Sequence, residues 1–206
     1  MNHVKTKTVG GALQSDRKIR NLVKIAMLSA VSFVLMLLSF PLAAVFPAFL
    51  RLDLSDLPAL LGGFAIGPAA GILIELIKNI LNILIKGTET GGIGELSNFI
   101  VGCCFVVPAS LIYLYHKNKN HAIGGLLAGT AVMTIGACFS NYYLIIPLYQ
   151  KFMPLEQIIA SSPVKAVTDM KTFILFAIVP FNLLKSMILS AATLLIYKKL
   201  SPVLHK

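Results

Sequence analysis

The chain has 206 residues, of which 57% are hydrophobic and 13% are charged, and its formal net charge is +10. Soluble domains contain about 25% charged residues, so this apolar surplus excludes an ordinary soluble enzyme, a disordered chain and a disulfide-linked scaffold. The composition instead predicts an all-α membrane protein, because a basic excess on an apolar chain is typical of loops retained in the cytoplasm.

Six apolar runs are the predicted membrane spans. A spanning helix needs about 20 mainly apolar residues, and Gly67-Pro68 divides one long apolar region into two runs because proline breaks a helix. The run before this break would cover only about 16 Å at 1.5 Å per residue, so the second span is expected to be short or tilted. The predicted spans cover residues 25–40, 56–66, 68–85, 95–115, 122–148 and 172–197.

The basic residues predict the orientation of these spans. Eleven of the 18 lysines and arginines lie near the two termini or at Lys117 and Lys119, and five lie in the loops on the other side. Both termini are therefore expected in the cytoplasm, which requires an even number of spans. We expect a flexible basic tail at residues 1–18, a six-helix transmembrane domain at residues 19–200 and a second cytoplasmic tail at residues 201–206.

Two of the predicted outer loops differ in character. Residues 41–52 read PLAAVFPAFLRL. An apolar loop of this kind either covers a cavity as a lid or lies in the bilayer interface, and composition leaves both interpretations open. Residues 150–171 form a longer and more polar loop, which is expected to be solvated.

The sequence lacks the motifs of several function classes. It has no phosphate-binding Gly-x-x-x-x-Gly-Lys-Ser/Thr loop, no His-Glu-x-x-His or paired Cys-x-x-Cys motif and no evident nucleophile–base pair. We therefore expect no enzyme activity, no cofactor and no metal site. Topology accounts for the basic charge, so no nucleic-acid partner is expected, and active transport would draw on an ion gradient or a partner protein.

Polar residues inside the predicted spans are costly in hydrocarbon and need an explanation. Glu75, Lys78, Asn79 and Asn82 share one face of the third span. Either Glu75 and Lys78 form an internal salt bridge, or this face carries a coupled ion.

A second polar pair, Glu95 and Asn98, opens the fourth span. Two interpretations remain open for it. The pair either contacts a ligand, or Glu95 is simply a carboxylate placed favourably at a helix N-terminus.

The last two spans carry the most informative polar residues. Asn182 and Lys185 share a face deep in the sixth span, and Asn141 lies toward the outer end of the fifth. Asparagine offers a donor and an acceptor side by side, and lysine adds donors, so these side chains would suit a flat heterocycle with carbonyl and N–H edges. Lys185 has no acidic neighbour on its own span. The alternative is that it pairs with Glu75 or Glu95 across the bundle and only holds helices together.

Small residues at four-residue spacing mark faces where helices can approach closely. Ala26 and Ala30 form such a pair on the first span. Packing within the chain is the default expectation, and contact with a partner helix is the alternative. The other stripes are Gly63, Gly67 and Gly71, and Gly125 and Gly129.

Six groups of motifs between about residues 24 and 197 give the chain a family resemblance. They are Ala26-x-x-x-Ala30; Phe49-Leu50-Arg51-Leu52-Asp53-Leu54-Ser55-Asp56-Leu57; Gly67-Pro68-x-x-Gly71 with Glu75-Leu76-Ile77-Lys78-Asn79; Gly94-Glu95-Leu96-Ser97-Asn98-Phe99; Asn141-Tyr142-Tyr143; and Pro180-Phe181-Asn182-x-x-Lys185. In this order and at these spacings they resemble the riboflavin-specific substrate-binding subunits (S components, RibU type) of energy-coupling factor (ECF) transporters.

The resemblance implies the S-component fold in the cell membrane and high-affinity binding of riboflavin for ATP-driven vitamin uptake. It implies that Ala26 and Ala30 contact a transmembrane coupling subunit, which works with two ATPase subunits. It places the vitamin beneath the first outer loop. The residues implied for this site are Asn141, Asn182, Lys185, Glu95, Asn98, Phe46 and Phe49.

Two other functions remain as alternatives. One is an S component for another vitamin or precursor, although the cation Lys185 argues against a positively charged vitamin by like-charge repulsion. The other is an autonomous ion-coupled carrier that uses Glu75 and Lys78.

Overall fold

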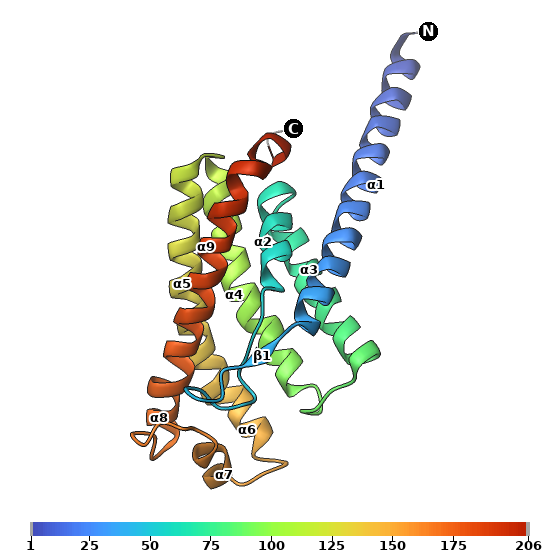
Figure 1. Ribbon diagram of the computed structural model, residues 1–206. Coiled ribbons are helices and arrows are strands. Elements are labelled where there is room, and N and C mark those ends of the chain that lie inside the picture. The colour runs from blue at the N-terminus through green and yellow to red at the C-terminus, as the bar shows by residue number, and fades with distance from the viewer. Residues whose placement is uncertain (1, 205–206) are drawn as a thin grey trace.

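The computed structural model is a helical bundle with both chain ends at one end and a two-stranded loop at the other (Figure 1). It describes residues 2–204, and it describes side chains for residues 16–196. Within this part of the chain, five helical stretches are long and apolar enough to cross a membrane, and each contains most of one predicted span. These stretches are Asp16–Leu37, Pro68–Lys86, Ile93–Tyr115, Lys119–Tyr149 and Met170–Ile196.

Helix α1 (Asn2–Leu37) projects beyond the rest of the bundle at its N-terminal end (Figure 1). It includes most of the segment for which composition predicts a flexible tail. The side chains of residues 1–15 and 197–206 lie outside the described ones, so the division into tails and a central domain stays a prediction.

Three of the spans are composite helices with a π-helical turn. Helix α3 (Pro68–Leu81) continues into η1 (Asn82–Lys86), α5 (Lys119–Ser140) into η2 (Asn141–Ile145) and α6 (Ile146–Tyr149), and α8 (Met170–Phe173) into η3 (Ile174–Ile178) and α9 (Val179–Leu204). Helix α4 (Ile93–Tyr115) has no such turn.

A proline follows two of the three π turns. Pro147 follows η2 and Pro180 follows η3. Neither proline has an N–H to donate to the residue four positions earlier, so the regular helical ladder is interrupted there. Such turns occur frequently at functional sites, and all three lie in the half of the bundle away from the chain ends (Figure 1).

The predicted break at Gly67-Pro68 is confirmed. Helix α2 (Asp56–Ala65) ends just before Gly67, whose φ of +137° is a conformation that L side chains rarely adopt. Pro68 is the first residue of α3, where a missing N–H costs nothing. Because α2 has only ten residues, it is not among the five long stretches.

Glycines bring α4 and α5 into backbone contact. A Cβ added at Gly125 would lie 2.6 Å from the Ala109 carbonyl oxygen, and one at Gly129 would lie 2.7 Å from the Phe105 carbonyl oxygen. The predicted role of this stripe in packing within the chain is therefore confirmed. Gly63 and Gly71 also pack closely against α4, but against side chains, since added Cβ atoms would overlap those of Ser110 and Val106.

The loop predicted to be the first outer one is more ordered than the sequence suggests. Strands β1 (Phe40–Pro41) and β2 (Arg51–Leu52) pair in antiparallel register, with Phe40 opposite Leu52. Arg51 donates to Ser39 from Nε (3.0 Å to Oγ) and from Nη2 (2.9 Å to the backbone oxygen). We name this contact the Arg51–Ser39 clamp, because it joins the two ends of the loop.

The expectation that residues 150–171 are solvated is wrong in part. This segment contains the short helix α7 (Leu155–Ala160), and Ile158 and Val167 are buried in the hydrophobic core. At its end, Asp169 caps α8 by accepting a hydrogen bond from the Thr172 N–H at 2.7 Å, and the Thr172 hydroxyl accepts from the Asp169 N–H. The Thr172 hydroxyl also donates to Asp169 Oδ1 at 3.0 Å, and the two hydrogen bonds from the Thr172 N–H and hydroxyl lower the pKa of the Asp169 carboxyl.

Candidate ligand-binding site

Two adjoining cavities lie beneath the first outer loop. The first, which we name the amide cavity, contains about 560 Å³ of unfilled space, part of it open to solvent. The second, the carboxylate cavity, contains about 630 Å³. Phe49, Arg51, Gly94 and Asn98 line both, so the two spaces share a wall.

The two cavities collect six of the seven residues implied for a ligand site. Asn98, Asn141, Asn182, Lys185 and Phe49 line the amide cavity, and Glu95 lines the carboxylate cavity together with Asn98 and Phe49. Phe46 is the exception. It packs behind the cavity, with its ring centroid 5.4 Å from that of Phe181 in an edge-to-face contact. Phe181 itself lines the amide cavity.

Asn141 and Asn182 are held in the same way. Each donates from Nδ2 to the carbonyl oxygen four residues earlier, Ala137 and Ile178 respectively, at 2.8 Å. Both side chains are buried in the wall of the amide cavity. An asparagine has two N–H donors and one carbonyl acceptor, so each keeps a donor and an acceptor for a polar, planar ligand.

Aromatic rings complete the amide cavity. Phe49 from the first loop lies 5.6 Å from Tyr149 and 6.2 Å from Phe173 between ring centroids. Because Phe49, Leu50 and Arg51 all line this cavity, the first loop covers it. Of the two interpretations of the loop, the structure favours the lid.

Glu95 lies in the first turn of α4 and is also hydrogen-bonded by its neighbours. Its Oε1 accepts from Asn82 Nδ2 at 3.0 Å and its Oε2 accepts from the Thr88 hydroxyl at 3.0 Å. The position at the helix N-terminus matches one of the two interpretations of this residue. Asn82 Oδ1, which is buried, has no hydrogen-bond partner among the described residues.

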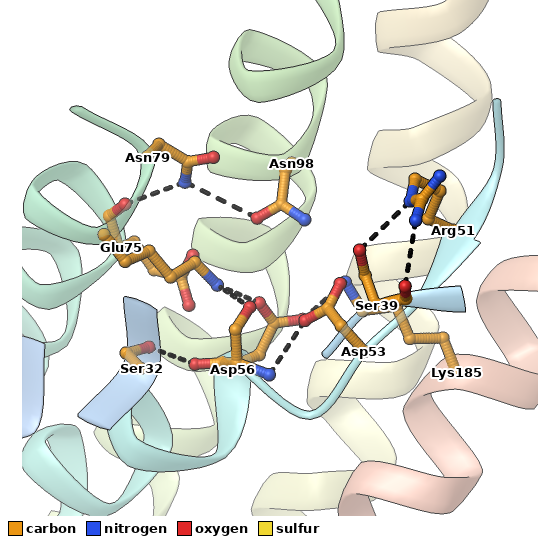
Figure 2. Close-up of polar contacts among 11 residues, drawn as sticks. Ser32, Ser39, Arg51, Asp53, Asp56, Glu75, Asn79, Asn98 and Lys185 are labelled. Atoms are coloured by element: carbon orange, nitrogen blue, oxygen red, sulfur yellow. Dashed lines mark hydrogen bonds and ion pairs between the residues drawn. The ribbon is translucent and has the colours of Figure 1, made fainter. Parts of the chain in front are cut away.

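A buried ion network adjoins the cavities, since Lys185 lines the amide cavity and Asp53 lines the carboxylate cavity. Figure 2 shows its polar contacts. The predicted pair of Glu75 and Lys78 is confirmed at 2.8 Å between Oε2 and Nζ. Lys78 also contacts Asp56, and it donates to the Ser55 hydroxyl at 2.8 Å. The network thus joins α3 to the first residue of α2.

Lys185, which has no acidic neighbour on its own span, is paired with acidic residues from another segment of the chain. Its Nζ lies 2.9 Å from Asp56 Oδ2 and 3.5 Å from Asp53 Oδ2. The alternative interpretation predicted a pairing of Lys185 with Glu75 or Glu95, but Lys185 contacts the two aspartates instead. The pairing crosses more than 120 positions of the sequence, which explains why spacing within one helix did not reveal it.

The network holds three carboxyl groups and two amino groups, and all five are buried. Burying such groups is costly unless each is paired, and the neighbouring backbone is tied accordingly. The Ser32 hydroxyl of α1 donates to the Ser55 carbonyl, and the Ser55 N–H donates to Asp53 Oδ1 at 2.8 Å. These contacts fix the segment between β2 and α2 against α1, α3 and α9.

The sequence did not predict an ion-pair or ligand contact for three residues of this region, Arg51, Asp53 and Asp56. All three lie in the segment Arg51-Leu52-Asp53-Leu54-Ser55-Asp56. The available signal was that this short stretch places three charges between an apolar loop and an apolar helix. In a chain with 13% charged residues, such a cluster is unusual.

The chain matches known proteins over most of its length. The family model for the substrate-specific component of ECF transporters matches residues 20–197. The riboflavin transporter FmnP of Bacillus subtilis (strain 168) is 39% identical, covering 90% of this chain and 94% of that protein. The riboflavin transporter RibU of Staphylococcus aureus (strain TCH60) is 36% identical, covering 91% and 93% respectively.

A solved structure has the same fold. The S component of a bacterial ECF transporter superposes with a TM-score of 0.72 at 35% identity, over 92% of this chain and 99% of that chain. Together with the apolar helices, these similarities make the chain a multi-pass protein of the cell membrane and a transporter subunit rather than an enzyme. The chain belongs to the family of substrate-specific components of ECF transporters.

Proposed function

We propose that this chain is the high-affinity riboflavin-binding subunit of an ATP-driven ECF vitamin transporter. The observation that carries the proposal is the amide cavity, which combines amide and ammonium groups with aromatic rings beneath an apolar lid. An isoalloxazine ring is flat and has a carbonyl and N–H edge, so it needs these two kinds of contact. The relatives named as riboflavin transporters share 36–39% of their residues with this chain over about nine tenths of its length, which supports the same ligand.

In this proposal Asn141, Asn182 and Lys185 bind the polar edge of the flavin and its ribityl chain. Phe49 contributes apolar contact from the lid, and Phe46 acts through Phe181, against which it packs. Glu95 and Asn98 bind hydroxyl groups where the two cavities meet.

The proposed topology has six crossings with both termini in the cytoplasm, and α2 is the short second crossing. Figure 1 supports an even number, since the two chain ends lie at the same end of the bundle. The basic turn between α4 and α5, with Lys117 and Lys119, lies at that end too, as expected for the cytoplasmic side. The amide cavity then opens toward the outside of the cell.

The proposal includes partners: a transmembrane coupling subunit and two ATPase subunits. Ala26 and Ala30 are exposed on α1, beside the exposed Val23, Met27 and Val34. A small-residue face of this kind lets a second helix approach closely. We place the coupling subunit there.

An arginine on this face tests the docking site. Ala30→Arg should leave riboflavin binding unchanged and abolish uptake by cells that express the whole transporter, because a bulky cation prevents close helix contact. Leu127→Arg is the matched control, since Leu127 is exposed on α5 and should leave uptake intact. Normal uptake with Ala30→Arg would place the docking face elsewhere.

Purification of the chain tests the ligand. Protein purified from cells grown with riboflavin should be yellow and show a flavin absorption spectrum, and denaturation should release riboflavin into the supernatant. A colourless protein that also fails to take up added riboflavin would overturn the proposal. Uptake into liposomes that contain this chain alone would instead favour an ion-coupled carrier.

A further inference from the structure

One buried carboxylate, Asp56, is shared by two buried lysines. Asp56 Oδ1 contacts Lys78 Nζ, and Oδ2 lies 2.9 Å from Lys185 Nζ. Asp56 and Lys78 are fully buried, and the Lys185 side chain is 5% exposed. Asp56 is also the first residue of α2, where the positive end of the helix dipole favours a carboxylate. Figure 2 shows it at the centre of the polar cluster.

The two lysines differ in whether an N–H group remains free to bind a ligand in the cavity. Lys78 donates hydrogen bonds to Ser55 Oγ and Asp56 Oδ1 and forms an ion pair with Glu75, so three groups of the network surround its ammonium. It lines neither cavity.

Lys185, in contrast, lines the amide cavity. Its acidic contacts among the described residues are Asp56 at 2.9 Å and Asp53 at the longer distance of 3.5 Å. Its hydrogen bond goes to Asp53, and Asp56 is an ion-pair contact, so at least one of its three N–H groups remains for an acceptor in the cavity.

We propose that Asp56 is a positioning residue for ligand binding in the amide cavity. It holds the Lys185 ammonium at the cavity wall, and Lys78 fixes Asp56 from the opposite side. The inference rests on the proposed function, because the carbonyl oxygens and ring nitrogens of riboflavin are the acceptors that Lys185 reaches.

The geometry gives the consequence of removing Asp56. Lys185 would keep only its contact with Asp53, and its flexible stem would let the ammonium leave the cavity wall. Lys78 would still have Glu75 and Ser55. Loss of the Asp56 charge therefore displaces Lys185 more than Lys78.

A double-mutant cycle on riboflavin affinity tests the proposal. Asp56→Asn should weaken binding about 10- to 100-fold, as expected for a lost buried contact to a charged group. In a Lys185→Met background the same change should alter affinity by less than about threefold, because Asp56 acts through Lys185. Asp56→Glu, which keeps the charge, should restore part of the affinity, and Asp56→Ser replaces Asp56→Asn in the cycle if that variant does not fold.

Glu75→Gln is the matched control within the same network. Glu75 contacts Lys78 and not Lys185, so this variant should lose thermal stability and keep its riboflavin affinity. The proposal is overturned if Asp56→Asn binds riboflavin normally, if its effect is equally large in the Lys185→Met background, or if Glu75→Gln weakens binding as much as Asp56→Asn. A wild-type chain that fails to bind riboflavin would overturn the proposed function and this inference together, whereas the other outcomes leave the function intact.

Discussion

The two halves of the bundle are built from the same helices and differ in what lies between them. In the half near the chain ends, Gly125 and Gly129 bring α5 against the α4 backbone, and the rings of Phe64 and Tyr113 stack at 4.3 Å between centroids. In the other half, α4 carries Asn98, η2 at the end of α5 carries Asn141, and both border the amide cavity.

This contrast indicates that one half of the bundle stabilises the fold and the other half binds the ligand. Where backbones touch through glycine there is no room for a ligand, and the packing holds the helices in place. Where the helices carry asparagines, aromatic rings and π turns, the walls of a cavity form. The comparison predicts that mutations in the first half change stability and leave affinity intact, and that mutations in the second half do the reverse.

The largest effect is expected from Gly125→Val. A Cβ at this position would lie 2.6 Å from a backbone oxygen of α4, which cannot move aside as a flexible side chain could. Overpacking of this kind should destabilise the chain by about 3 kcal/mol, which thermal unfolding in detergent would measure.

Gly124→Val is the control for that change. It places the same residue one position earlier on α5, where an added Cβ meets nothing within 4 Å. Equal melting temperatures for the two variants would show that the helices in this half are not packed through their backbones. The folded fraction of Gly125→Val should bind riboflavin normally.

Asn182→Ala should have the second largest effect, and this effect should be on affinity instead of stability. Losing a buried hydrogen bond to the ligand should cost about 2 kcal/mol, or roughly 30-fold in affinity, with little change in melting temperature. The measurement is a riboflavin titration by calorimetry.

Thr193→Ala provides the comparison on the same helix. The Thr193 hydroxyl is buried and donates to the Leu189 carbonyl at 2.7 Å, four residues earlier, as Asn182 does to Ile178. Thr193 lines neither cavity, so this variant should keep its affinity. An equal loss in both variants would mean that Asn182 affects binding only through α9.

The positions of five of the six predicted membrane spans were predictable from the sequence, because a helix that crosses hydrocarbon must be long and apolar. The apolar runs, the Gly67-Pro68 break and the glycine stripes all act locally, and the structure agrees with them. The face of α3 that carries Glu75 and Lys78 was also readable, since a salt bridge three residues apart follows from helix geometry.

The partners of Lys185 were not predictable in this way. Asp53 and Asp56 lie in a segment that resembles a loop, more than 120 positions earlier in the chain. Nothing in local spacing indicates that the short helix α2 brings its first residue to α9. The same limit applies to Phe46, whose contact with Phe181 depends on how the first loop folds back.

The smallest effect should come from the lid. Arg51→Ala removes the Arg51–Ser39 clamp and should speed riboflavin dissociation about fivefold, the equivalent of about 1 kcal/mol for a hydrogen bond. Ser39→Ala, which removes only the hydroxyl acceptor, should have a smaller effect in the same direction. Stopped-flow recovery of flavin fluorescence measures both rates.

Lys165→Ala is the control for the lid, since Lys165 is an exposed basic residue of the other outer loop. It should leave the dissociation rate unchanged. If Arg51→Ala and Lys165→Ala dissociate riboflavin at the same rate, the clamp does not hold the lid closed.

The most direct test of the amide cavity as the riboflavin site is to titrate riboflavin into the purified chain and into its Asn141→Ala/Asn182→Ala variant. Flavin fluorescence reports the binding in both titrations. We expect the wild type to quench the fluorescence of one riboflavin per chain. The equally folded variant should cause no quenching at the same concentrations. Quenching by both proteins alike, or by neither, would contradict the assignment of the amide cavity as the riboflavin site.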